Sequence, residues 1–292
     1  MFDKLQIDIQ INYITPSDLG YFSLSINTEA AMYAYYAILK QIFGERDYFQ
    51  YKALADVIVD VMEIVIDEKA IANVLPGNAL FVMHGLKPKK VKYIDYEYDN
   101  KTFTSKEIEK TKTELSPDFT VVFETKNEKI FDKIIDLPIK MNKDSSLNYV
   151  KVGDYYRLVT GKNELIDTIY FMVKDGKCII TTSLKDVTDP AQNSNAVNDA
   201  VKQSILNNNY SVRVDFGRLI KSLAMEVSDK SDRKMIDYLQ NNINTMTLES
   251  SVKDGSIHTS AIINIKGNHK NSFEYLFNVI ENLLEMSEPG KR

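Results

Sequence analysis

Two Asp-Gly dipeptides, each within the sequence Val-Lys-Asp-Gly, constrain the fold of this chain more than any other feature. They lie at Asp175-Gly176 and Asp254-Gly255, and apolar and polar residues alternate in the segments that flank them. Alternation with a period of two is typical of half-buried β-strands, and Asp-Gly tolerates the positive φ angles that a two-residue turn requires. The sequence therefore predicts two antiparallel hairpins.

Other strands and helices are predicted from the same periodicities and from capping residues. Alternation from Leu5 to Tyr13 predicts an N-terminal strand, and the next strand, 21–26, has Phe22 and Leu24 on one face. Further strands are expected at 79–86, 91–98, 119–125, 155–160, 169–174, 177–183 and 210–214. Helices are expected at about 28–44, 52–66, 127–135, 215–226, 233–243 and near the C-terminus. This order predicts an α+β fold with mainly antiparallel sheets built from hairpins and with helices packed on one face.

Polar segments are predicted to connect these elements. Residues 87–90 are expected to turn the chain between two strands, and the charged segment 99–114 predicts an exposed loop because it lacks an apolar stripe. The polar stretch 186–198 is the best linker candidate, so residues 1–292 are expected to form a single α+β region with a sub-boundary there. The shared Val-Lys-Asp-Gly turns allow a diverged internal duplication, although turn chemistry alone would select the same residues.

Charge and cysteine content exclude several classes of protein. The chain has 36 Lys and Arg against 41 Asp and Glu, and nucleic-acid binding usually needs a basic face, so we expect no nucleic-acid partner. A single cysteine, Cys178, rules out an internal disulfide. The N-terminus lacks the uninterrupted apolar run of a signal peptide, and no window approaches the ~18 apolar residues of a transmembrane segment.

Motif searches predict no catalytic residue, no cofactor and no metal site. The 11 glycines form no phosphate-binding loop. His84, His258 and His269 are too far apart for a metal-ligand motif, so each is expected to be a structural or surface residue. Cys178 precedes two isoleucines in a strand pattern, which is typical of an inert core cysteine rather than a nucleophile. We therefore expect no enzymatic activity, although a site need not follow a local motif.

One group of carboxylates has helical spacing. Asp56, Asp60, Glu63 and Asp67 recur at intervals of four, three and four residues, so they would share one face of a continuous helix. Such a stripe is typical of the solvated face of an amphipathic helix. The alternative is a site for a cation or a basic partner.

A second group of carboxylates follows a strand pattern. The segment Asp95–Asn100 superficially offers calcium ligands, but Asn100 and Lys106 stand where a calcium loop needs Gly and Glu. The pattern is typical of an ordinary half-solvated strand. The alternative is an exposed surface for a protein partner, with these candidate residues: Tyr93, Asp95, Glu97 and Asp99.

Four short segments carry a family resemblance. They are 76–82 (PGNALFV), 96–99 (YEYD), 116–120 (SPDFT) and 271–276 (NSFEYL). In this order the chain resembles the C-terminal portion of an uncharacterised family of exported lipoproteins from Bacteroidetes-type bacteria. The resemblance implies an extracytoplasmic location, in the periplasm or at the outer-membrane surface, and a lipid anchor on a segment outside this chain. It implies no activity, and this chain has no lipidation cysteine near its start.

These observations lead to one main functional hypothesis and two alternatives. The main hypothesis is a non-enzymatic cell-envelope protein that binds or scaffolds another protein. The alternatives are a carrier of an apolar ligand in a cavity between sheet and helices, and an enzyme with dispersed carboxylates. A deep apolar pocket would favour the carrier, a cleft with two convergent carboxylates would favour the enzyme, and a flat apolar patch would favour the scaffold.

Overall fold

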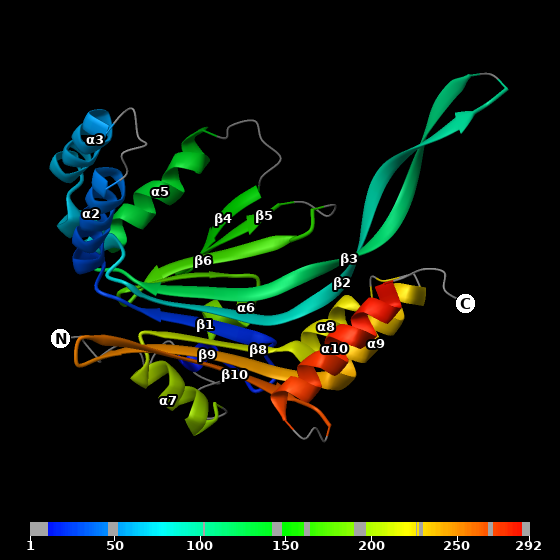
Figure 1. The fold of residues 1–292 in the computed structure, drawn as a ribbon. Helices are drawn as coiled ribbons and strands as arrows, with labels where there is room; N and C mark the ends of the chain where they lie inside the picture. The colour runs from blue at the N-terminus through cyan, green and yellow to red at the C-terminus, as the bar shows by residue number, and fades with distance from the viewer. Residues whose placement is uncertain are drawn as a thin grey trace.

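The structure, a computed structural model, describes residues 11–45, 52–101, 103–141, 148–160, 164–189, 197–225, 227, 230–267 and 271–287. It confirms an α+β fold built on one antiparallel sheet (Figure 1). The strand order is β10-β9-β8-β1-β2-β3-β7-β6-β5-β4, so strands from the first and last thirds of the sequence pair in the middle of the sheet.

Ten strands make up this sheet among the described residues. They are β1 (Gly20–Ser25), β2 (Asn78–Asp99), β3 (Thr104–Glu124), β4 (Asn148–Val152), β5 (Tyr155–Val159), β6 (Thr168–Lys174), β7 (Lys177–Thr181), β8 (Tyr210–Asp215), β9 (Ile243–Lys253) and β10 (Ser256–Ile265). The helices are η1 (Ile11–Tyr13, 3₁₀), α2 (Thr28–Glu45), α3 (Lys52–Val65), α4 (Glu68–Val74), α5 (Glu128–Met141), α6 (Leu184–Thr188), α7 (Asp199–Asn207), α8 (Phe216–Leu223), α9 (Lys230–Asn242) and α10 (Ser272–Ser287).

Both predicted Asp-Gly hairpins are confirmed. Asp175 and Gly176 join β6 to β7 with φ angles of 53° and 72°, and Asp254 and Gly255 join β9 to β10 with φ angles of 50° and 76°. Two successive positive φ angles define the type I′ class of turn, whose twist matches that of the strands. The local sequence was therefore sufficient to specify these turns.

Helix starts follow side-chain caps. Asn27 Oδ1 accepts a hydrogen bond from Ala30 N, Asp215 Oδ1 from Arg218 N, and Asn271 Oδ1 from Glu274 N, each at 2.9 Å. Each cap satisfies one of the backbone N–H groups that a first helical turn leaves without a partner. The predicted ends were less accurate, because α5 continues through Pro138 to Met141 instead of ending at 135.

Three predictions about local structure were wrong. Residues 11–13 form η1 rather than the end of a strand, and 5–10 lie outside the described residues. Residues 87–90 do not turn the chain, because β2 runs through them as one strand. The segment 99–114 is mostly strand, since β3 begins at Thr104 and its polar side chains pair across to β2. Most of the described residues in 99–114 are nevertheless exposed, as predicted.

The two faces of the sheet differ in how well they are covered. On one face, η1, α6 and α7 pack on Leu80, Val82, Val122 and Ile179, which are all at most 2% exposed. On the other face, α5 contacts β6, while α8 contacts β2, β8 and β9 at the opposite end (Figure 1). The main core therefore lies on the face covered by η1, α6 and α7.

Candidate functional site

The less covered face of the sheet carries two apolar rows. Paired registers align one residue from each of five adjacent strands, β9, β8, β1, β2 and β3, in each row. The first row is Leu248, Val212, Phe22, Phe81 and Val121, and the second is Met246, Val214, Gly20, Met83 and Phe119. We call the surface formed by these ten residues the trough.

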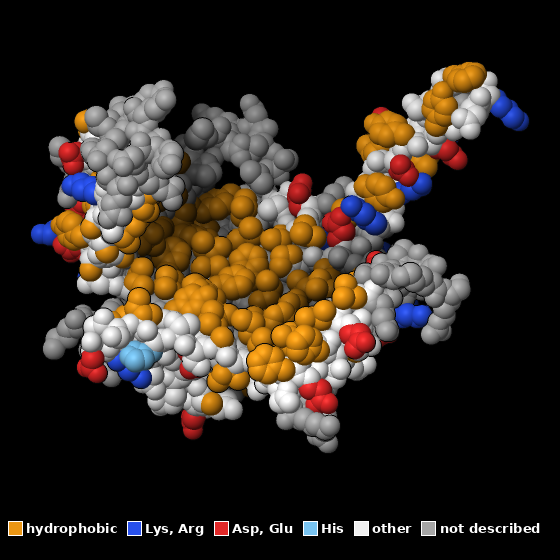
Figure 2. Space-filling model, viewed as in Figure 1, with side chains coloured by type: hydrophobic (Ala, Val, Ile, Leu, Met, Phe, Trp, Pro, Cys, Tyr) orange, Lys and Arg blue, Asp and Glu red, His pale blue; other side chains and the backbone are white. Residues whose placement is uncertain are grey.

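The trough side chains are half-buried, with their outer sides open to solvent. Figure 2 shows hydrophobic side chains gathered in the hollow of the sheet, between α2 and α5 on one side and the α8–α10 end on the other. Within the trough the rings of Phe81 and Phe119 stack with their centroids 6.1 Å apart. An apolar surface that spans five strands is larger than the scattered single side chains that any soluble protein exposes.

Gly20, in the second row, allows the backbones of β1 and β8 to approach each other closely. A Cβ atom at this position would lie 2.3 Å from the carbonyl oxygen of Arg213 on β8, so only glycine fits there. The strands of the trough are therefore held together where β1 passes β8.

Helices beside the sheet expose further apolar stripes. On α10 the stripe consists of Phe273, Phe277, Ile280 and Leu284, each at least 45% exposed. The opposite side of α10 contacts α9, since Tyr275 Oη donates to the backbone oxygen of Asn242. The stripe is therefore exposed on the side of α10 that lies away from Tyr275.

Strands β2 and β3 extend beyond the sheet as a two-stranded ribbon (Figure 1). Pairing of β2 with β1 ends at Met83, and pairing of β3 with β7 begins at Thr120, so the outer parts of both strands pair only with each other. We call residues 90–112 the arm. At its base, Lys89 Nζ donates to the backbone oxygen of Glu164 and to Asp167.

The residues predicted as a docking surface lie on one side of β2 within the arm. Asp95 pairs with Lys110 at 2.5 Å, and this hydrogen bond holds the pKa of Asp95 below its usual range. Lys112 Nζ lies 5.5 Å from the ring centroid of Tyr93. Glu97 is exposed, and Asp99 ends the strand. Whether these four residues bind a partner stays a prediction.

Isolated apolar side chains alternate on the other side of the same strand. Ile94, Tyr96 and Tyr98 are each more than half exposed, and Phe103 at the tip is 78% exposed. Tyr96 Oη donates to Glu107 across the ribbon at 3.3 Å. The arm thus exposes a row of large apolar side chains that nothing in the described chain covers.

The acidic stripe is shorter than predicted. Helix α3 ends at Val65, and Asp67 instead caps α4 by accepting a hydrogen bond from Ala70 N at 2.9 Å. Asp60 is exposed and pairs with Lys40 at 3.2 Å. The side chains of Asp56 and Glu63 lie outside the described residues. Among the described residues, no cluster of His, Cys, Asp and Glu could hold a metal ion.

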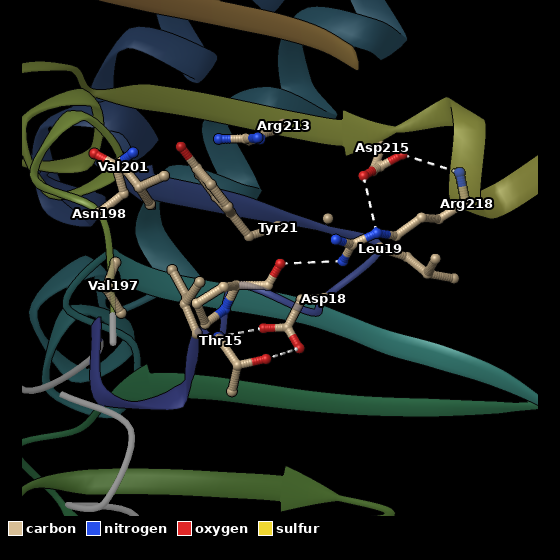
Figure 3. A pocket seen from close by; sticks show the side chains of 13 residues that line it. Thr15, Asp18, Leu19, Tyr21, Val197, Asn198, Val201, Arg213, Asp215 and Arg218 are labelled. Atoms are coloured by element: carbon tan, nitrogen blue, oxygen red, sulfur yellow. Dashed lines mark hydrogen bonds and ion pairs between the residues drawn. The ribbon is translucent and has the colours of Figure 1, made fainter. Parts of the chain in front are cut away.

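A small cavity lies on the covered face, beside the turn that precedes β1 (Figure 3). It encloses about 180 Å³ and is lined by Tyr21, Val201, Arg213 and Arg218, among others. Arg218 donates to Pro16 O and pairs with Asp215 at 3.3 Å. The lining is therefore mixed in polarity, and much of its charge is already paired.

Beside this cavity, His84 lies between two buried carboxylates. Its Nδ1 is 2.9 Å from Asp18 Oδ1, and its Nε2 is 3.1 Å from Asp186 Oδ2 and 2.9 Å from Thr120 Oγ1. Asp18 is fixed by bonds from Thr15 N and Thr15 Oγ1, while Asp186 belongs to α6. The β2–β3 register shifts between Met83 and Gly85, so His84 lies at a β-bulge.

The two carboxylates decide the charge of His84. Burial by itself lowers its pKa, but hydrogen bonds and the negative charges of Asp18 and Asp186 outweigh burial and raise the pKa to about 9. His84 is therefore an imidazolium at neutral pH, and both ring nitrogens donate to carboxylates. Burial, and then the charge of Asp186, also raises the pKa of the nearby Tyr13 to about 12.

The other groups weighed from sequence have simpler surroundings. Cys178 is fully buried, and burial raises the pKa of its thiol well above its usual range, which agrees with an inert core residue. His258 is exposed on β10, and His269 lies outside the described residues. The His84 cluster was missed because its members, at positions 18, 84, 120 and 186, are far apart in sequence.

No described helix combines the length and the apolar character needed to cross a bilayer.

No family model matches the chain. No curated protein matches it either. Among solved structures, the chain is similar to TP0453 in its crystal form III, with 8% sequence identity and a TM-score of 0.34 over 94% of this chain and 85% of that one. A likeness at this level carries no argument about function, and the lipoprotein resemblance stays a prediction.

Proposed function

We propose that this chain is a non-enzymatic protein of the cell envelope that binds another protein on its trough. The observation that carries the proposal is the pair of apolar rows across five strands, which stay half-buried while the main core lies on the opposite face. Contiguous apolar surfaces of this kind on folded proteins mark interaction sites. The cell-envelope setting is supported only by the lipoprotein resemblance.

The shape of the trough supports a protein partner over a small apolar ligand. A carrier would enclose most of its ligand in a cavity of about 300 to 1,000 Å³. The described cavity is smaller, at about 180 Å³, and its lining is partly charged. The trough is apolar but open along one side (Figure 2), so a partner with its own broad surface suits it better.

The buried carboxylates give little support to an enzyme. Asp18 and Asp186 do converge, but His84 fills the space between them. With both ring nitrogens donating, the imidazolium has no lone pair with which to accept a proton. This cluster instead ties the turn before β1, strand β2 and helix α6 to one another.

Site-specific photo-crosslinking tests the proposal. Benzoylphenylalanine is placed at Leu248, within the trough, and as a control at Asp154, an exposed position in the β4–β5 turn. Irradiation is carried out in cells that naturally produce the chain, and the adducts are identified by mass spectrometry. We expect a discrete protein adduct from position 248 and none from position 154.

Two outcomes would contradict the proposal. Equal adducts from both positions, or none from either, would mean that the trough is not a specific protein-binding surface. Adducts whose added mass is that of a lipid or other small apolar molecule would favour the carrier instead.

A further inference from the structure

The arm exposes more apolar surface than a folded monomer normally tolerates. Five of its large apolar side chains, at positions 93, 94, 96, 98 and 103, are between 38% and 78% exposed. A two-stranded ribbon is at best marginally stable in water when neither of its faces is covered. The arm is therefore expected to lie against another surface.

The charge pattern of the arm indicates which part of it makes contact. Six lysines are distributed along the ribbon, at positions 90, 92, 101, 106, 110 and 112. Lysines on exposed strands oppose the addition of further strands to the edge. Contact through the apolar side chains of one face is consequently favoured over edge-to-edge pairing of two arms.

The area of the arm matches what a stable dimer needs. At about 200 Å² for each full side chain, the exposed fractions of Ile94, Tyr96, Tyr98 and Phe103 leave roughly 500 Å² of apolar arm surface. If two copies each covered this area with an equal area of the other chain, the dimer would bury roughly 2,000 Å². Standard protein interfaces bury about 1,600 Å².

We propose that the partner on the trough is a second copy of this chain, whose Ile94, Tyr96, Tyr98 and Phe103 pack on the trough of the first. This inference rests on the proposed function and names its partner. The four arm side chains and the trough residues are apolar and at least partly exposed in the same chain, so a two-fold exchange covers both sets at once. Each chain then contributes one arm and one trough.

Sedimentation velocity over a range of concentrations tests this proposal. We expect the native chain to sediment at twice its mass of 33.4 kDa in the micromolar range and to dissociate on dilution. Ile94→Ser should raise the dissociation constant at least about tenfold, because the contact is lost twice in a symmetric dimer. Ile262→Ser on β10 is the matched control, since Ile262 is 53% exposed and Ile94 is 61% exposed. The control should change the constant less than about twofold.

Mixing two variants shows which surfaces meet. Ile94→Ser damages the arm, and Leu248→Ser damages the trough, so each variant alone should be largely monomeric. Their mixture retains one intact arm and one intact trough, and we expect a heterodimer that is tighter than either homodimer. Circular dichroism spectra that match the native chain would show that both variants are folded.

A monomer at all concentrations up to about 100 μM, or an equal effect of Ile94→Ser and Ile262→Ser, would overturn this inference. If the crosslinker at Leu248 then still captured a different protein, the proposed function would stand and only the identity of the partner would be wrong. If it captured nothing, both proposals would fail.

Discussion

The buried His84 cluster makes the stability of this protein depend on pH in an unusual direction. An unfolded histidine has a pKa of 6.5, whereas folded His84, between Asp18 and Asp186, has a pKa of about 9. The folded state therefore keeps a proton that the unfolded state releases between these two values. The stabilisation is complete below pH 6.5 and is lost as the pH rises through 9.

The gap between the two pKa values corresponds to roughly 3 kcal/mol of unfolding free energy. Urea unfolding followed by circular dichroism at pH 6.0, 7.0, 8.0 and 8.5 should show most of this loss. The range stops at 8.5 because deprotonation of the buried Cys178 thiol in the unfolded state adds to the loss above about pH 9. This loss is a large fraction of the total unfolding free energy of a typical domain.

Two variants distinguish the contribution of His84 to the pH dependence of stability from the contributions of other titrating groups. His84→Gln should remove the pH dependence, whereas His258→Gln should retain it because His258 is exposed on β10. If His84→Gln does not fold, NMR titration of the His84 ring in the native chain should give a midpoint above pH 8. A flat or rising stability between pH 6 and 8.5, or an NMR midpoint near 6.5, would refute the reasoning.

Three further substitutions, with Gly85→Ala as a control, test strand packing, a turn and a helix cap. Gly20→Ala should destabilise the fold by more than about 2 kcal/mol, because its Cβ would lie 2.3 Å from Arg213 O, while Gly85→Ala meets no atom within 4 Å and should cost far less in urea unfolding. Gly255→Ala should cost about 1 kcal/mol because its φ is 76°, and an unchanged melting temperature would contradict this turn assignment. Asp215→Ala removes the cap of α8 and should also cost about 1 kcal/mol; a loss below 0.3 kcal/mol would mean that this cap contributes little.

Local chemistry explains which parts of the fold could be predicted from sequence. Asp-Gly turns and helix starts depend on two to four neighbouring residues, so the turn at Asp175-Gly176 and the helix starts near 28 and 215 were predicted correctly. The arm was not predicted, because residues 104–114 are mostly polar. They pair across the ribbon with β2, and this pairing leaves no apolar stripe in the sequence. Pro88 also suggested a turn, although it lies within a continuous strand.

The candidate site depended on contacts that no local pattern contains. The sequence did place Phe22 and Leu24 on one face of a strand, but the buried side chains of β1 are Tyr21 and Ser23 on the other face. Which face is covered depends on η1, α6 and α7, which come from distant parts of the chain. The trough therefore becomes visible only when the registers of five strands are known.

The central claim is that the trough is open in the isolated chain and covered by a partner in the cell. Hydroxyl-radical footprinting tests it most directly, because Met83 and Met246 lie in the trough, Met172 is only 8% exposed in the core, and Met225 is 52% exposed elsewhere. In the isolated, dilute chain we expect oxidation of Met83 and Met246 to exceed that of Met172. Inside the cells that produce the chain, Met83 and Met246 should become protected while Met225 stays reactive. Equal oxidation of the two trough methionines in both settings, relative to Met225, would contradict the account.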